Sequence, residues 1–166
     1  MRSMRRPTLL AGLVLVIGML LPGSALAAAG GSDLPFKGSV SGTSTHNLLT
    51  GQVHAVSTGE VTHLGLTAVE QSATFTGGPT TFVWSGTATL TAANGDKMYG
   101  ATAGTCTRPS PTSVQCSVVF TSSGGTGRFA HASATFTITL LSQRVAFVSP
   151  FSYGEHTATL DGHMSW

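Results

Sequence analysis

Charged residues are scarce in this 166-residue chain, and familiar catalytic motifs are missing from it. Charged side chains make up 8% of the sequence and form no basic patch with interleaved aromatics, which argues against a nucleic-acid partner. There is no HExxH, no HxH pair and no GxSxG, so the sequence predicts neither a metal site nor a serine hydrolase, and no cofactor. Amphipathic helical periodicity is also lacking after residue 34, which excludes a helical domain.

The N-terminus has the pattern of a signal peptide. Three arginines within the first six residues precede an uncharged apolar run over residues 9–21, and Ala25-Leu26-Ala27 supplies the small residues of a cleavage site. The run is too short for a membrane-spanning helix, which needs about 20 residues. We therefore expect cleavage after Ala27, a flexible lead-in over residues 28–33, and a secreted, extracellular product with no stable membrane anchor. The sequence leaves the export route, Sec or twin-arginine, open.

The remaining chain has the size of one domain and almost no net charge. It keeps five basic and six acidic side chains, a formal charge of −1, so the basic pI of about 8.8 comes from the N-terminal peptide. We expect this domain to cover residues 34–166 and to be monomeric or weakly associating.

Cysteine is limited to Cys106 and Cys116. Export permits a disulfide between them, and the two prolines at 109 and 111 predict that the intervening segment is a loop between strands. A bridge across its base would stabilise a hairpin by about 2–3 kcal/mol. A metal or redox pair is the alternative, but the spacing does not match CxxC.

Residues alternate between apolar and polar along most of the domain, the pattern of half-buried strands. Strands are expected over residues 36–43, 52–57, 61–76 (one bent strand or two), 81–92, 97–105, 114–121, 133–141, 144–149 and 154–165. Eight or nine short strands with tight turns predict a β-sandwich or a closed up-and-down antiparallel barrel. The short sequential connections favour a barrel of eight strands, nine being the alternative.

Two stretches predict tight turns. Asn94-Gly95 is typical of a type I′ hairpin, in which both central residues have positive φ. Gly124, Gly125 and Gly127 lie within four residues, directly before a regular strand, and predict a turn in which the backbone approaches another segment closely. Arg128 is expected to anchor this turn by hydrogen bonds to carbonyls or a carboxylate, with anion binding as the alternative.

Three segments together resemble a known superfamily. They are Thr62-His63-Leu64-Gly65 within an expected strand, the hairpin from Thr87 to Met98, and Gly124-Gly125-Thr126-Gly127-Arg128-Phe129-Ala130. The chain is similar to small secreted bacterial proteins that look like allene oxide cyclase and plant dirigent proteins. It departs from that group at His131-Ala132-Ser133-Ala134, where Gly-Ala-Thr-Gly is usual. The resemblance implies a closed barrel and leaves the activity open, because its motifs are turns and packing positions.

The candidate site residues are those whose alternation places them inside the expected barrel. Phe82, Trp84, Phe136 and Ile138 are predicted either to build the core or to line a pocket for a small apolar molecule. His156 lies on the same face as Ala158 and Leu160, as a ligand-bonding or acid–base group or as a core histidine with a polar partner.

Other ionisable residues are weaker candidates. Glu70 shares parity with Leu64 and Leu66, which puts it inside or at the rim. His156 and His163 are seven residues apart, so on one strand they face opposite sides and cannot share a metal. The catalytic residues, if any, and a protein partner are not indicated.

Three functions agree with these features. The first is a secreted barrel that binds a small hydrophobic ligand or serves as a scaffold. The second, implied by the plant resemblance, is an isomerase or cyclase that folds a reactive substrate inside the barrel and needs few ionisable groups. The third is an extracellular structural or interaction protein with a packed barrel. Free volume inside the barrel distinguishes the first two from the third, and a non-enzymatic function is favoured.

Overall fold

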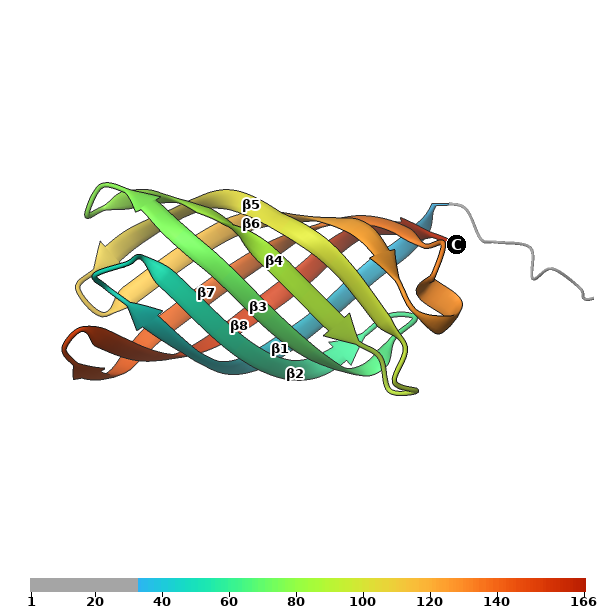
Figure 1. Cartoon of the computed structure of the whole chain (residues 1–166), viewed down its shortest axis with the longest axis horizontal. Coiled ribbons are helices and arrows are strands. Elements are labelled where there is room, and N and C mark those ends of the chain that lie inside the picture. Colours follow the sequence, from blue (N-terminus) through green and yellow to red (C-terminus); the bar gives the residue numbers. More distant parts are fainter. Residues whose placement is uncertain (1–32) are drawn as a thin grey trace, which may run out of the picture.

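The computed structural model describes residues 33–166, which form one closed barrel of eight antiparallel strands (Figure 1). The strands are β1 (Leu34–Asn47), β2 (Gln52–Val61), β3 (Gly65–Gly77), β4 (Thr81–Thr91), β5 (Lys97–Ser110), β6 (Ser113–Gly125), β7 (Ser133–Val148) and β8 (Phe151–Ser165). A short 3₁₀ helix, η1 (Gly127–Phe129), connects β6 to β7. The predicted all-β, antiparallel architecture is confirmed. The predicted signal peptide and the lead-in up to residue 32 lie outside the described residues.

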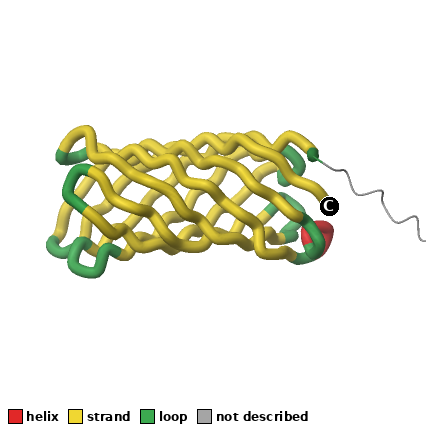
Figure 2. The backbone as a smooth tube through the Cα atoms, turned by 90° about the horizontal axis from the view of Figure 1, so that it is seen from above, coloured by secondary structure: helices red, strands yellow, loops and turns green. Residues whose placement is uncertain are grey.

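Every strand pairs with the next one along the chain, and β8 pairs back with β1 to close the ring (Figure 2). This closure excludes the sandwich. We call the end that carries the β1–β2, β3–β4, β5–β6 and β7–β8 turns the distal end. The opposite, terminal end carries the other three turns and both ends of the described chain, where Leu34 pairs with Met164.

The separate strand expected over residues 144–149 is wrong. These residues continue β7, which runs unbroken to Val148 and pairs with β8 over its whole length. The register shifts between Arg144 and Ala146, so one extra residue is accommodated as a bulge. The bulge interrupts the alternation in the sequence without ending the strand, which explains the expected break.

The expected strand over residues 61–76 is also wrong at its start. Val61 ends β2, and a tight turn at Thr62–Leu64 precedes β3. His63 sits in the left-handed region with φ 67°, and Gly65 follows with φ 70°. The motif Thr62-His63-Leu64-Gly65 is therefore a turn at the terminal end and not part of a strand. Leu64 is buried from within the turn, whereas Leu66 lies on the outer side of β3 and is exposed.

The Asn94-Gly95 hairpin is present, but its turn type differs from the prediction. Only Gly95 has positive φ (87°), and its N–H donates to the Ala92 carbonyl at 2.9 Å. This is the geometry of a type I turn followed by a left-handed glycine, the pattern of a three-residue hairpin loop. Asn94 instead donates its side-chain amide to the Asp96 carboxylate at 2.8 Å.

The glycine-rich turn is held by Asp96 and Arg128. Gly127 adopts φ 54°, and a Cβ at that position would overlap the Asp96 carboxylate, so only glycine fits. The Arg128 backbone N–H donates to Asp96 Oδ2 at 3.2 Å, and the Arg128 guanidinium donates to the His63 carbonyl. The predicted anchoring role of Arg128 is confirmed, and it ties three turns of the terminal end together.

The disulfide between Cys106 and Cys116 is confirmed. The two residues are direct cross-strand partners in the β5–β6 ladder, with their Cα atoms 4.0 Å apart. The predicted loop between them is wrong in extent, because β5 continues to Ser110 and β6 begins at Ser113. Only Pro111 and Thr112 form the turn, so the bridge lies within the sheet and not at its end.

The inner face of the barrel is packed with side chains. Phe36, Phe136 and Phe120 form a stack with successive ring centroids 4.5 Å apart, and all three are buried. Glycines on neighbouring strands make room for these rings: a Cβ at Gly100 would lie 2.3 Å from the Phe120 ring. Small residues opposite large ones are the usual way to fill a small barrel.

No helix within residues 33–166 is long and apolar enough to cross a membrane.

Candidate functional site

The predicted lumen residues on β4 and β7 lie where the alternation placed them. Phe82, Trp84, Phe136 and Ile138 are all buried on the inner face. Phe75 packs against Phe82 and Trp84 with ring centroids 4.6 and 5.2 Å away. The Trp84 indole N–H donates to Thr102 Oγ1 at 2.9 Å. These four side chains build the core, since their neighbours contact them closely and satisfy the one polar group.

Glu70 does not belong to the interior, and its predicted inward orientation is wrong. Its side chain is 68% exposed on the outer face, and its Oε1 lies 3.2 Å from His54 Nε2 on β2. The physical reason is that Leu64 is buried from the turn and not from a strand, so its parity does not apply to β3, where Val69 faces inward and Leu66 and Glu70 face outward. Glu155 and His163 are exposed on the outer face of β8.

His156 is the predicted site residue that has a distinctive environment. It is 5% exposed, and its Nε2 lies 3.0 Å from Ser57 Oγ on β2. Gly42 separates the two on β1 and has no side chain to block the contact. His156 Nδ1 is the buried side-chain nitrogen that has no hydrogen-bond partner within residues 33–166. Burial lowers the pKa of His156 below its ordinary value of 6.5.

Around His156 the inner face changes from apolar to polar towards the distal end. Ser44, Ser142 and Ser152 are buried there, from β1, β7 and β8. Closure of the barrel brings these strands side by side: Gly154 on β8 pairs with Ser44 and with Arg144. This polar layer was not predicted from the sequence. The inward-facing residues of β1 (Val40, Gly42, Ser44, His46) indicate it, because they become polar towards the distal end.

Next to His156 the interior contains a small cavity of about 10 Å³. It is lined by Ser44, His46, Val53, Ala55, Phe75, Trp84, Val114, Cys116, Leu140, Ser142 and His156. A volume of this size holds about one water molecule. The space between the side chains is therefore too small for an organic ligand or substrate.

A second cavity, of about 30 Å³, forms the mouth of the barrel at the distal end. It shares His46, Val114 and Ser142 with the inner cavity and is bounded by Arg108 and Arg144. Arg144 Nε donates to Ser152 Oγ at 3.0 Å, and an Arg108 guanidinium nitrogen donates to the Pro79 carbonyl at 3.1 Å.

His46 stands between the two cavities. Its Nε2 lies 3.0 Å from Ser44 Oγ, and its ring packs edge-on against Phe75 with centroids 5.4 Å apart. Burial and, to a smaller extent, interaction with the nearby His156, Arg108 and Arg144 together lower the pKa of His46 to about 4. His46 is therefore neutral at pH 7, in a neighbourhood of positive charge.

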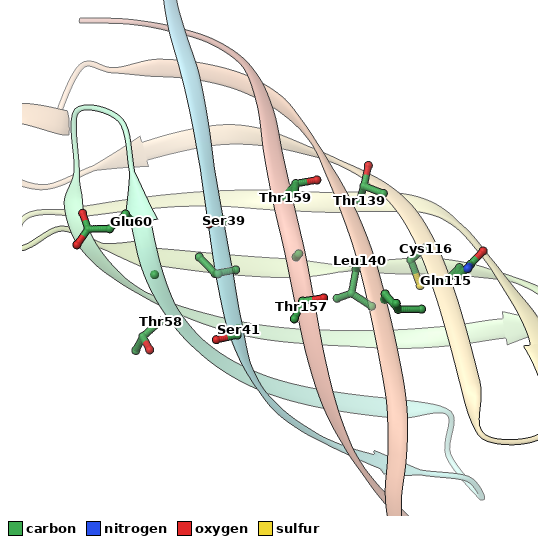
Figure 3. Close-up of a pocket in the computed structure, with 14 residues that line it drawn as sticks. Ser39, Ser41, Thr58, Glu60, Gln115, Cys116, Thr139, Leu140, Thr157 and Thr159 are labelled. Atoms are coloured by element: carbon green, nitrogen blue, oxygen red, sulfur yellow. The ribbon is translucent and has the colours of Figure 1, made fainter.

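The outer face of the barrel is rich in hydroxyl groups. A broad open depression of about 680 Å³ crosses β2, β1, β8, β7 and β6 on this side (Figure 3). Its labelled side chains include Ser39, Ser41, Thr139, Thr157 and Thr159, with Glu60 at one edge. Threonines alternate with the buried residues of each strand, so this face is the solvated side of the sheet.

Apolar side chains are exposed at the distal end, where they form what we call the distal rim. The rim consists of Leu48, Leu49, Val145, Phe147, Val148, Phe151 and Tyr153. They come from two neighbouring turns, β1–β2 and β7–β8, which are joined by a hydrogen bond from the Leu48 N–H to the Pro150 carbonyl at 2.9 Å. An exposed apolar group of this kind marks a contact surface.

The described residues contain no group of three or more histidine, cysteine, aspartate or glutamate side chains arranged to hold a metal ion. No protein-family model, curated protein or solved structure matches this chain.

Proposed function

We propose that the protein is a secreted interaction module that works through its surface and does not enclose a substrate. The observation that carries this proposal is the filled interior, where stacked phenylalanines and Trp84 leave a cavity of about 10 Å³. A hydrophobic-ligand carrier and a cyclase both need an enclosed volume of several hundred Å³. Of the three functions compatible with the sequence, the packed-barrel interaction protein fits this interior.

The proposal includes the compartment and the barrel type. Removal of residues 1–27 after export agrees with the Cys106–Cys116 disulfide, because such bonds persist outside the cytoplasm. An allene oxide cyclase/dirigent-type barrel agrees with the eight antiparallel strands and the glycine-rich turn before β7. The compartment rests on the signal-peptide pattern of the sequence, and the barrel type rests on the resemblance of the sequence to that superfamily.

The contact surface in this proposal is the distal rim, and its partner is a lipid surface with anionic headgroups. The rim lies at the tips of protruding turns, with Leu49 83% and Val148 64% exposed (Figure 1). Arg108 and Arg144 are the charged residues behind these tips, and none of the six acidic residues of the chain lies in the four distal turns. Apolar tips backed by arginine suit a membrane interface, where each cation near anionic lipid contributes about 1 kcal/mol. The contact is peripheral and reversible.

Vesicle sedimentation tests this function. The protein is mixed with vesicles of phosphatidylcholine alone or with added phosphatidylglycerol, and the bound fraction is measured. We expect binding that increases with phosphatidylglycerol and falls about tenfold in the double variant Leu49→Ser/Val148→Ser, a loss of about 1.4 kcal/mol. Both side chains are exposed, so this variant retains the packed core.

Leu66→Ser is the matched control, since Leu66 is 61% exposed at the terminal end. This control should bind vesicles as the unmodified protein does. If the unmodified protein sediments with neither kind of vesicle, the lipid-surface function is wrong.

A further inference from the structure

The mouth of the barrel holds two positive charges that have no negative partner. Arg108 and Arg144 bound the mouth cavity, and their hydrogen bonds go to a neutral carbonyl and a neutral hydroxyl. The ion pairs found in residues 33–166 involve Lys37, His54 and His163, and neither arginine takes part in one. No acidic residue is among those that line the mouth or the inner cavity in this part of the chain.

A second, independent feature lies in the inner cavity, next to the mouth. His156 is 95% buried, lines the inner cavity, and has an Nδ1 with no hydrogen-bond partner among residues 33–166. Buried polar atoms are almost always paired, so an unpaired one marks a place where a ligand or a water completes the structure. The Ser57 hydroxyl can donate to His156 Nε2, which leaves the ring proton on Nδ1 as a free donor.

The two features lie next to each other at the distal end. The mouth cavity and the inner cavity share the lining residues His46, Val114 and Ser142, so these side chains form the boundary between the arginines and His156. Buried serine hydroxyls from β1, β7 and β8 line the two cavities, and each can donate a hydrogen bond. The two cavities thus offer several donors but no anionic acceptor.

We propose that the distal mouth is a binding site for a small carboxylate. Arg108 and Arg144 attract and orient the anion at the entrance, and the Ser142 hydroxyl, which lines both cavities, donates to it from below. One water molecule in the inner cavity links the anion to the His156 Nδ1–H, since about 10 Å³ holds a water and no organic group. Guanidinium groups match the planar geometry of a carboxylate. The mouth cavity of about 30 Å³ receives the carboxylate group, so any larger remainder of the molecule stays outside, near Phe147, against which Arg144 packs.

The site does not depend on the lipid-surface function. A free carboxylate in solution tests it without vesicles, and a protein that fails to sediment with lipid can still bind acetate. Conversely, rim variants such as Leu49→Ser/Val148→Ser leave both arginines and His156 in place, so they should keep acetate binding.

NMR of the ¹⁵N-labelled protein provides the direct test. Sodium acetate is titrated at pH 7 and constant ionic strength while the His156 ring nitrogens and the Arg144 Nε resonance are followed. We expect saturable shifts of both groups, with a dissociation constant in the millimolar range. The His156 spectrum also reports which ring nitrogen carries the proton, and protonation at Nδ1 is expected.

Two substitutions at the mouth of the barrel and one matched control complete the test. Arg108→Gln and Arg144→Gln should each weaken acetate binding about tenfold. Lys97→Gln removes the same charge at the terminal end and should leave the affinity unchanged. Both arginines are only partly buried, and a thermal melt of each variant checks that the barrel is intact.

Three results would overturn the proposal. The first is the lack of any saturable shift of the His156 resonances at acetate concentrations up to about 0.1 M. A dissociation constant above that concentration is too weak for a specific site. The second is an equal loss of affinity in Lys97→Gln and Arg144→Gln, which would mean that acetate only screens the overall charge. The third is a response to chloride as strong as that to acetate, which would exclude recognition of the carboxylate.

Discussion

At the scale of single residues, the two inner histidines make stability depend on pH. Burial keeps His46 and His156 neutral, since the folded protein holds the pKa of His46 at about 4 and that of His156 below 6.5. In the unfolded chain both groups take up a proton near pH 6.5. The unfolded state therefore binds more protons below pH 6.5, and acid shifts the equilibrium towards it.

We predict that the free energy of unfolding is at its full value above pH 6.5 and falls as the pH drops from 6.5 towards 4. His46 alone should account for a loss on the order of 1–2 kcal/mol at pH 5. Urea unfolding at pH 7 and pH 5 measures the effect. His46→Gln should reduce this difference, whereas the exposed His131→Gln should leave it unchanged. Equal pH dependence in His46→Gln and the unmodified protein would contradict the prediction.

Single residues also show which inward-facing positions the sequence predicts and which it does not. The alternation of β4, β7 and β8 was enough to place Trp84, Phe136 and His156 inside, because the strand period is strictly two. It failed for Glu70, because His63 adopts a left-handed conformation in a turn that carries no proline and no preceding glycine. The carboxylate site was not predictable either, since Ser57 and His156 meet across 99 residues of sequence.

At the scale of elements, the disulfide joins β5 and β6 within their ladder, towards its distal end. Its sequence separation of 10 residues closes a short loop in the unfolded chain. In the folded protein the bridge joins two residues that the strand register already pairs. The neighbouring residues Thr105 and Thr107 are each paired with a residue of β6 as well. The bridge therefore adds stability without determining the fold.

We predict that the double variant Cys106→Ala/Cys116→Ala retains the barrel and loses about 2–3 kcal/mol of stability. This corresponds to a decrease of about 5–15 °C in the midpoint of thermal unfolding. Far-ultraviolet circular dichroism checks the fold, and a melt gives the midpoint. Thr105→Ala, a neighbouring outward-facing change, is the control. An unchanged midpoint in the double variant would mean that the bridge contributes nothing to stability.

Elements were predicted well in the middle of the barrel and less well at its two ends. The tight hairpin at Asn94-Gly95 gave a boundary that the structure keeps, although with a different turn type. β5 and β7 run past their expected ends because pairing with a neighbour stabilises residues that have weak strand patterns alone. The bulge at Arg144 and the proline of β5, Pro109, could not be distinguished from loops by sequence pattern.

At the scale of the whole molecule, the packed interior determines what the purified protein carries. The barrel closes around side chains, and the volume left near His156 is about that of one water molecule. A bound hydrophobic compound would require several core side chains to move together, which dense protein cores resist.

We predict that protein purified from a secreting host has the same mass under native and denaturing conditions. Mass spectrometry under both conditions makes the comparison, and solvent extraction identifies anything that is released. A weakly held carboxylate is lost on buffer exchange and does not disturb the result. A stoichiometric organic compound that survives purification would show that the interior opens, and would restore the ligand-carrier function.

Both ends of the described chain leave the barrel from the same side. Leu34 pairs with Met164 at the terminal end, while Arg108, Arg144 and the distal rim lie at the other end. A tether attached to either terminus, whether a surface anchor or an engineered fusion, would therefore hold the molecule at its terminal end. The two ends of the barrel therefore have different roles. A surface that carries many tethered copies would display the distal mouth of each copy to the solvent.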